Sequence, residues 1–339
     1  MSSILSQLDR SPFMTRRGFL GLTALSTGTL LAGCASQGAA PSTGPDAAGS
    51  ATKIKVAASF YPMYDFASKI GGDRVDVTCL VPAGTEPHEW EPSTADMRTL
   101  GEAKLLVYNG AGMEHWVDDT LASLGGDVPK AVEASKGADL LKLSADALKE
   151  EQEEEQSSGG DPSKVSDTDP HCWLSPRVAK QEMSNIRDGL VAVDPDGAST
   201  YDANYETWAA KLDALDEEFR SGLDPLPNKS IVVSHEAFGY LCHDFGLTQM
   251  PIEGIEADAE PDAQAMAKIV DFVKAHGVKT IFSEELVSPK VAQSIADATG
   301  AKVEVLNPLE GLSDEELAAG DDYFSVMRSN LDELTKALS

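Results

Sequence analysis

The sequence predicts an α/β protein with two lobes, each a mainly parallel β-sheet flanked by helices, joined by one long rigid helix. Three observations predict this fold. Short apolar runs alternate with helical patterns in both halves of the chain, which is typical of parallel sheets. About 287 residues, from 53 to 339, are too many for one ordinary core and enough for two. Between the halves, residues 198–223 keep helical spacing without a break.

The first 33 residues have the pattern of an export signal. Basic residues precede a short apolar run from Gly18 to Leu31. The run is shorter than the roughly 20 residues that span a bilayer, so residues 1–33 are predicted to be a signal peptide that is removed. Thr15–Leu20 resembles a twin-arginine export signal. An ordinary secretory signal and an uncleaved anchor stay open as alternatives.

The end of this signal resembles a lipobox, with the sequence Leu-Ala-Gly-Cys at residues 31–34. Cys34 is therefore predicted to be the lipidated first residue of the mature chain and to anchor it to the cell membrane, outside the cytoplasm. Residues 34–52 consist mainly of Ala, Ser, Gly, Pro and Thr. This composition cannot build a core, so the segment is predicted to be a flexible tether.

The first lobe is expected over residues 53–193. Its apolar runs KIKVAAS, VDVTCLV and KLLVYN are predicted strands, and Met63–Ile70 and Thr94–Glu102 between them are predicted helices. Within residues 146–169, the acidic run Glu150–Glu155 has no apolar partner, which predicts a solvated loop. Whether this loop gathers metal ions weakly is left open.

Residues 194–226 are predicted to link the lobes. Pro195 stands at a position typical of a first helical turn. Aromatic and aliphatic residues then recur at helical spacing from Tyr201 to Phe219. The helix would be roughly 40 Å long and would restrict hinge motion. The alternative is a surface helix of the first lobe.

The second lobe is expected over residues 227–339. Its apolar runs KSIVVSH, KTIFSE and AKVEVL are predicted strands. A helical stretch follows each strand, at residues 236–245, 289–299 and 321–338. A further helix is predicted over Asp262–His276, with Gly277 as its stop.

The charge and the cysteines narrow the class of protein. The formal net charge is −29, and removal of residues 1–33, which carry three Arg and one Asp, brings it to −29 − 2 = −31. This charge makes nucleic acid an unsuitable partner and attracts cations. Cys79, Cys172 and Cys242 cannot form a disulfide framework. Cys79 is expected in the core, Cys172 is expected to pack beneath a site, and a Cys172–Cys242 disulfide is left open.

Four loop residues form a candidate metal site: His88, His171, His235 and Glu310. His88, His235 and Glu310 each follow a predicted strand, and ligands of open parallel sheets gather outside such strand ends. Three imidazoles and one carboxylate fill a tetrahedral shell for zinc and leave no position for a reactive water. Because the set comes from both halves, it predicts a zinc site in a cleft between lobes, in a protein that carries zinc rather than using it.

The other histidines, His115, His243 and His276, are expected to be structural or surface residues. His235 and Glu236 begin a sequence that could suggest a metalloprotease helix, but Gly239 stands where the second His of that motif belongs. A zinc hydrolase would also need an open coordination position, which a four-residue shell does not offer.

Six motifs now reveal a resemblance to a known family: PAGTEPHEWEPS, DPHCWLSP, SHEAFGY, FSEELVSPKVA, LNPLEGL and DYFSVMRSNL. The chain resembles the zinc-binding lipoproteins that serve ABC importers, the metal-specific branch of the solute-binding proteins, over residues 53–339. The resemblance implies metal in the cleft, an ABC permease as partner, a monomer and no enzymatic activity. Matched residue by residue, it implies His88, His171 and His235 as ligands.

Two departures from the family pattern concern the site. Many zinc members carry a His-rich loop where this chain has Glu150–Glu155. Some members use an Asp ligand near the position of Asn307, but the neutral side chain of Asn307 would be a poor ligand. Glu310 is therefore the expected fourth ligand, by analogy with members that read NPLE. Manganese members place a carboxylate at the position of His235, so imidazole here favours Zn²⁺. The alternatives are a binding protein for manganese or another divalent metal, and a surface adhesin.

Overall fold

The computed structural model describes residues 52–126, 128–159, 161–255 and 261–339. The predicted signal peptide, Cys34 and all but the last residue of the predicted tether lie outside the described residues. All the described residues belong to one compact unit. In the described part of the chain, no helix combines the length and the apolar character that a membrane span requires.

The first sheet consists of four parallel strands in the order β2-β1-β3-β4. Its strands are β1 (Ile54–Ala58), β2 (Val75–Cys79), β3 (Leu105–Tyr108) and β4 (Lys130–Glu133). Alternate residues of the central strands face opposite cores, with Val56 and Leu105 in one and Ala57 and Leu106 in the other. Both faces are therefore covered, as parallel sheets require. The covering helices are α1 (Tyr61–Gly71), α2 (Thr94–Glu102), α3 (Val117–Ser123) and α5 (Pro176–Val193).

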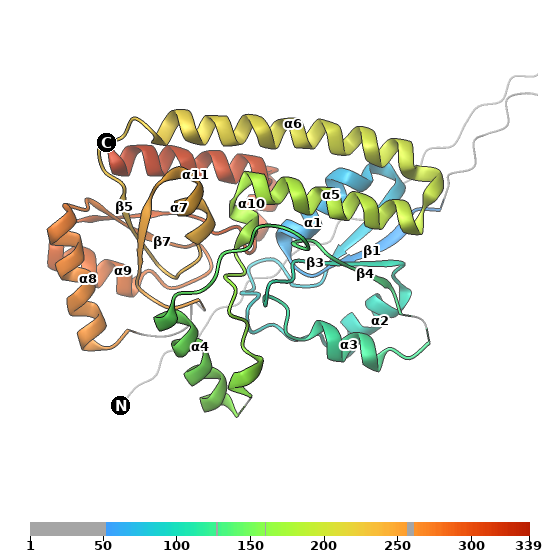
Figure 1. The fold of residues 1–339 in the computed structure, drawn as a ribbon, viewed down its shortest axis with the longest axis horizontal. Coiled ribbons are helices and arrows are strands. Elements are labelled where there is room, and N and C mark those ends of the chain that lie inside the picture. Colours follow the sequence, from blue (N-terminus) through green and yellow to red (C-terminus); the bar gives the residue numbers. More distant parts are fainter. Residues whose placement is uncertain (1–51, 127, 160, 256–260) are drawn as a thin grey trace, which may run out of the picture. The chain divides into compact units, whose positions relative to one another are not determined.

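The second sheet repeats this order with strands β6-β5-β7-β8, again all parallel. Its strands are β5 (Ser230–Val233), β6 (Thr248–Pro251), β7 (Thr280–Ser283) and β8 (Lys302–Val305). Around it lie α7 (Gly239–Phe245), α8 (Ala263–His276), α9 (Lys290–Thr299), α10 (Asp314–Ala319) and α11 (Tyr323–Leu338). The predicted α/β class with two helix-flanked parallel sheets is confirmed (Figure 1).

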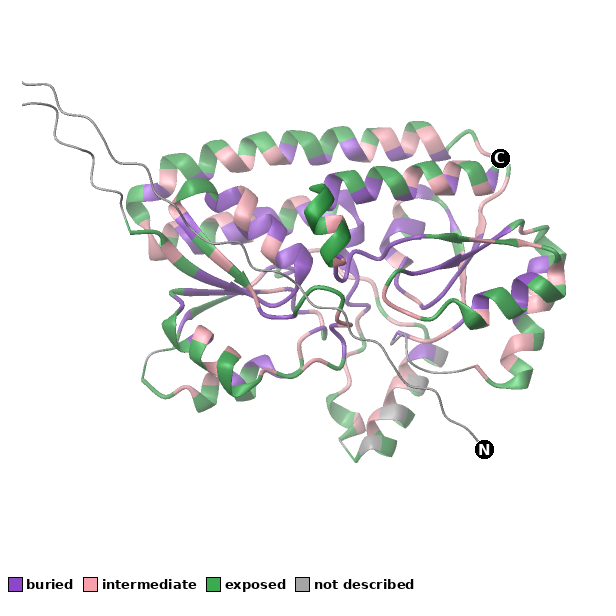
Figure 2. Cartoon of the chain, turned by 180° about the vertical axis from the view of Figure 1, so that it is seen from behind, coloured by how far each residue is buried: buried purple, intermediate pink, exposed green. Residues whose placement is uncertain are grey.

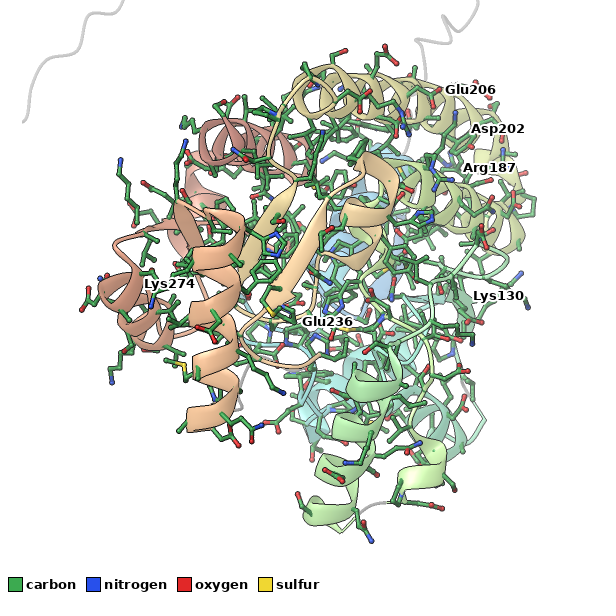
Figure 3. The ribbon with its side chains drawn as sticks, turned by 60° about the vertical axis from the view of Figure 1, so that its left-hand side comes forward. Lys130, Arg187, Asp202, Glu206, Glu236 and Lys274 are labelled. Atoms are coloured by element: carbon green, nitrogen blue, oxygen red, sulfur yellow. The ribbon has the colours of Figure 1, made fainter. Side chains whose placement is uncertain are left out.

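Helix α6 (Ala198–Leu223) runs unbroken for 26 residues past both sheets (Figure 1). Trp208 donates its indole N–H to the carbonyl of Lys69 at 3.1 Å, which fixes α6 against α1. Phe219, nearer the other end, stacks on Phe245 of α7 with ring centroids 5.0 Å apart. Toward α5, Asp202 pairs with Arg187 of that helix at 3.1 Å (Figure 3). The long predicted helix is confirmed, and it contacts elements that surround both sheets.

Helix α11 comes last in the chain but packs against the first helix. The Tyr323 ring meets Phe66 edge-on with centroids 5.0 Å apart. Lys69 Nζ lies 2.6 Å from Asp65 and 2.9 Å from Asp322, in a junction where its side chain is only 10% exposed. Apolar residues from both halves form one continuous buried cluster, and Figure 2 shows buried positions along the strands and inner helix faces.

The expectation of a loop over 146–169 is wrong for its first half, which forms helix α4 (Ala145–Ser158). The Ser144 side chain accepts from Ala147 N at 3.0 Å and caps the start, and Gly159 ends the helix with a φ of 92°. Lys149 and Glu153 pair at 2.9 Å one turn apart. Glu, Ala, Lys and Gln favour helix strongly, so propensity and caps outweigh the repulsion between like charges.

Candidate metal centre

The four predicted site residues converge from separate segments. His88 lies in the loop after β2, His235 follows β5 directly, and Glu310 follows β8. His171 precedes a short 3₁₀ turn (Cys172–Leu174), and Asn109, at the end of β3, holds its segment by donating to Pro170 O at 2.9 Å. One potential ligand atom from each of the four lies within 4.8 Å of the others.

The ligand atoms of these four side chains form one buried cluster, the metal pocket. Glu310 Oε1 lies 3.0 Å from His171 Nε2, 3.1 Å from His235 Nε2 and 3.3 Å from His88 Nε2. His171 Nε2 is also 3.2 Å from His88 Nε2 and 3.3 Å from His235 Nε2. His171 and His235 are fully buried, and His88, the most accessible of the four, is 7% exposed. Three nitrogens and one oxygen that meet at one point form a donor set suited to zinc.

Two further carboxylates hold the imidazoles from behind. Asp169 Oδ1 lies 2.9 Å from His171 Nδ1, and Glu284 Oε1 lies 2.7 Å from His235 Nδ1. A proton held on Nδ1 by such a partner leaves the Nε2 lone pair free to bind a metal ion. Neither Asp169 nor Glu284 belongs to the set of site residues expected from the sequence. The signals were the Asp-Pro-His spacing and the place of Glu284 directly after β7.

A glycine makes room for one of these carboxylates. Gly239, the first residue of α7, has no side chain, and a β-carbon there would collide with Oδ2 of Asp169. Tyr240, the next residue, donates its hydroxyl to Asp169 O at 2.8 Å. The start of α7 therefore fixes the position of Asp169 and, through it, of His171.

The loop that carries Glu310 has a strained backbone. Leu309 has a φ of 61°, and among the described residues only Ala111 is another non-glycine with positive φ. Asn307 Oδ1 accepts from Leu309 N at 2.7 Å, and Trp173 donates its indole N–H to Pro308 O at 2.8 Å. Asn307 thus holds the turn through its side-chain oxygen. A left-handed leucine costs on the order of 1–3 kcal/mol, so the surrounding contacts must impose it.

The pocket also shifts the protonation of its own groups. Burial alone would raise the pKa of Glu310, but the charge of His235 and hydrogen bonds from His171, His235 and His88 hold that pKa well below its usual value. Burial would lower the pKa of His171 and His235, but the carboxylates of Asp169, Glu284 and Glu310 outweigh it and raise both. Without a metal ion, these carboxylates therefore favour the protonated forms of His171 and His235, and a metal ion would have to displace those protons.

The remaining predicted residues lie away from the pocket's converging atoms. Within the described residues, Cys79, Cys172 and Cys242 are all free, so the disulfide left open is absent there. Cys79 is partly rather than fully buried, because it lies on edge strand β2, and burial raises its pKa to about 12. His115 pairs with Glu91 at 2.9 Å and His243 with Asp244 at 3.1 Å, both at exposed positions.

Comparisons with known proteins agree with this geometry. The family model of ZnuA, described as the periplasmic component A of a zinc-uptake complex, matches residues 56–337. The chain is 42% identical over 286 residues to the high-affinity zinc uptake system protein ZnuA of Bacillus subtilis, a match that covers 84% of this chain and 88% of that protein. It is 38% identical over 279 residues to the zinc-binding lipoprotein AdcA of Streptococcus pneumoniae, of which it spans about half (54%), while 82% of this chain is covered.

Solved structures extend the likeness to the fold. The Zn(II)-bound ZnuA-like domain of Streptococcus pneumoniae AdcA matches with a TM-score of 0.70 and 36% identity, which covers 84% of this chain and 99% of that one. The laminin-binding protein Lmb of Streptococcus agalactiae, described as bifunctional with adhesin and metal transporting activity, matches with a TM-score of 0.72 and 33% identity, over 84% of this chain and 100% of that one.

Proposed function

The chain belongs to the ZnuA family of zinc-uptake components, and from this membership we propose that it captures Zn²⁺ outside the cytoplasm and delivers it to an ABC importer. Zinc is the cargo of this protein and not a cofactor for chemistry. The observation that carries the proposal is the convergence of three imidazole Nε2 atoms on one oxygen of Glu310.

In this proposal His88, His171, His235 and Glu310 bind the ion. Nitrogen ligands suit Zn²⁺, whereas Mn²⁺ prefers oxygen ligands, so the donor set favours zinc over manganese. The order of intrinsic affinities would also admit Cu²⁺ or Ni²⁺, which leaves selection among these metals to pocket geometry and supply. Asp169 and Glu284 would keep the two imidazoles they contact in the binding tautomer.

Four protein ligands leave no position for a reactive water, so we assign no enzymatic activity. A zinc hydrolase would need an open coordination position and a base within reach of it. Capture then consists of deprotonation of the imidazoles and closure of the shell around the ion. The continuous core shared by both halves favours small loop movements over a wide hinge.

The proposal extends to organisation and location. Residues 1–33 act as a signal, lipidated Cys34 anchors the mature chain to the membrane, and residues 34–52 tether it. The lobes would then be 53–193 and 227–339, with 194–226 between them, in a monomer that delivers its ion to a membrane permease and binds no nucleic acid. Lipoprotein status is supported by the description of AdcA as a zinc-binding lipoprotein.

The decisive experiment measures zinc binding to the purified mature chain by calorimetry and metal analysis. Replacement of His88, His171 or His235 by Ala should each weaken zinc binding by orders of magnitude, because each removes one quarter of the shell. His243→Ala is the matched control, since this histidine is exposed and pairs with Asp244. Unchanged affinity in any one of the three variants would remove that residue from the site, and absence of zinc binding in the wild type would refute the function.

A second candidate function, adhesion, is favoured by the likeness to Lmb. It is tested by surface binding of the zinc-loaded and metal-free chain to immobilised laminin. Saturable binding that survives removal of zinc would support an adhesin role in addition to transport. Absence of binding would leave zinc delivery as the function.

A further inference from the structure

Beyond the four converging side chains, one residue of the last helix is placed to control the fourth of them. We propose that Asn330 of α11 is a positioning residue for Glu310, acting through the main chain of Asn307. The proposal rests on the proposed function, because it concerns how tightly that same pocket holds zinc. Asn330 itself contacts no ligand atom in the described structure.

The first step is the contact between Asn330 and the loop. Asn330 Oδ1 accepts from Asn307 N at 2.9 Å, and Asn330 Nδ2 donates to Asn307 O at 2.7 Å. One side-chain amide thus satisfies both main-chain polar groups of Asn307. Asn330 is 3% exposed and Asn307 is 4% exposed, so water does not offer either group an easy replacement partner.

The second step runs from Asn307 to Glu310. The Asn307 side chain accepts from Leu309 N at 2.7 Å and so closes the turn that holds Leu309 at a φ of 61°. Leucine does not adopt this conformation readily, so the turn relaxes when its fixed end is released. Because Glu310 follows directly, relaxation of Leu309 moves the carboxylate away from the three imidazoles.

Helix α11 contacts both segments that carry buried ligands, through Tyr323 and Asn330. Seven residues, or two helical turns, before Asn330, Tyr323 donates its hydroxyl to Trp173 O at 2.7 Å. Trp173 lies two residues after His171 and donates its own N–H to Pro308 O. The same face of α11 therefore holds the segment of His171 and the segment of Glu310 at a fixed separation. If Asn330 only stabilised the fold, its hydrogen bonds would not need to end on Asn307, in the loop that carries Glu310.

The test is a double-mutant cycle measured by zinc calorimetry on the mature chain. Asn330→Ala should weaken zinc binding roughly 10- to 100-fold, the usual effect of losing a residue that supports a metal ligand. In a Glu310→Ala background, the same substitution should cause no further loss, because the side chain that it positions is gone. Equal losses in both backgrounds, or no loss in either, would overturn the proposal.

A matched control separates positioning from general stability. Asn185 of α5 donates to two main-chain carbonyls, Ala134 at 2.7 Å and Lys136 at 2.9 Å, in a segment that carries no predicted ligand. Asn185→Ala should lower the melting temperature without changing zinc affinity. The Co²⁺-loaded Asn330→Ala protein should also show an altered visible d–d spectrum, which reports coordination geometry, whereas Asn185→Ala should not. An unchanged Co²⁺ spectrum in Asn330→Ala would count against the proposal.

A second variant and the wild type cover the two remaining outcomes of this experiment. If Asn330→Ala does not fold, Asn330→Asp keeps the acceptor for Asn307 N and the side-chain size but loses the donor to Asn307 O. This variant should also bind zinc more weakly, and wild-type affinity would refute the positioning role. If the wild type itself fails to bind zinc, the proposed function is wrong. If the wild type binds zinc and the Asn330 variants bind it equally tightly, this inference is wrong and the proposed function stands.

Discussion

Each imidazole of the proposed zinc site has a carboxylate within contact distance, so protons and zinc would compete for the same atoms. The structure raises the pKa of His171 and His235 and lowers that of Glu310 through these contacts. In the metal-free protein, the raised His pKa values stabilise the fold at low pH, and this contribution is lost as the pH rises through them. The lowered Glu310 pKa stabilises the fold above the ordinary carboxyl value and is lost on acidification below it.

Zinc affinity should therefore fall as the pH decreases, and the fall should begin above the ordinary histidine pKa of about 6.5. The physical reason is that the raised pKa values of His171 and His235 let protons compete with zinc for these ligands at a higher pH than for free imidazoles. Calorimetry at neutral pH, in buffers with different ionisation enthalpies, should detect proton release on zinc binding. Flat affinity between roughly pH 7 and 5, without proton release, would contradict histidine ligation.

The charge and type of each ligand should set the choice of metal. Glu310→Ala should leave three imidazoles, which still hold zinc, so binding should persist but weaken. His235→Glu should make a two-histidine, two-carboxylate shell with a relative preference moved toward Mn²⁺. A competition titration of Zn²⁺ against Mn²⁺ measures both effects. An unchanged ratio of affinities in His235→Glu would refute the ligand-type argument for zinc.

Among the elements, α7 has an exacting role for a helix of 7 residues. Gly239→Ala should displace the Asp169 carboxylate from its contact with His171 Nδ1. Loss of this contact should weaken zinc binding roughly 10- to 100-fold. The helix itself should not suffer, because Ala is a better helix former than Gly by about 1 kcal/mol. Gly101→Ala in α2, where a β-carbon meets nothing closer than 4.0 Å, is the matched control for zinc calorimetry. Equal affinities in the two variants would count against this role of α7.

The elements also divide into those that the sequence predicts and those that it does not. All six predicted strands form, and the inner strands β1, β3, β5 and β7 are the most buried, whereas most residues of the edge strands β2 and β8 are partly or fully exposed. Strands β4 and β6 are not predicted because their four-residue runs, KAVE and TQMP, hold few apolar residues. Helix α4 is not predicted because its run of like charges indicates a solvated loop, although its residue types and the Ser144 cap favour a helix.

The site follows the same division. Ligand identity at His88, His171, His235 and Glu310 is a matter of local motif, and the structure brings those four side chains together. The contacts of Asp169 and Glu284 depend on chain segments that meet only in the folded protein. The sequence places Asp169 beside His171 and Glu284 directly after β7, but it does not show which imidazole each of them contacts.

On the scale of the whole molecule, one core joins what the sequence presents as two lobes. Zinc binding should therefore leave the radius of gyration in solution unchanged within the precision of small-angle scattering. The reason is that rotation of one half against the other would expose buried contacts such as Phe66 with Tyr323. Scattering of the metal-free and zinc-loaded chain at equal concentration makes the comparison. A clear contraction on binding would show that the halves move as bodies.

The packing of α11 on α1 has a consequence for folding during synthesis on the ribosome. Tyr61 and Asp321, which touch across this junction, are separated by 260 positions in the chain. At roughly 5–20 residues per second, a ribosome needs on the order of 10–50 s to supply the second after the first. Throughout that interval α1 can pack on its own sheet and, later, on α5 and α6, but the part of Phe66 that meets Tyr323 lacks its final partner. The nascent chain must therefore avoid aggregation until its last residues emerge. A truncation shortly before α11 would leave the contact surface of α1, in the first half of the chain, uncovered.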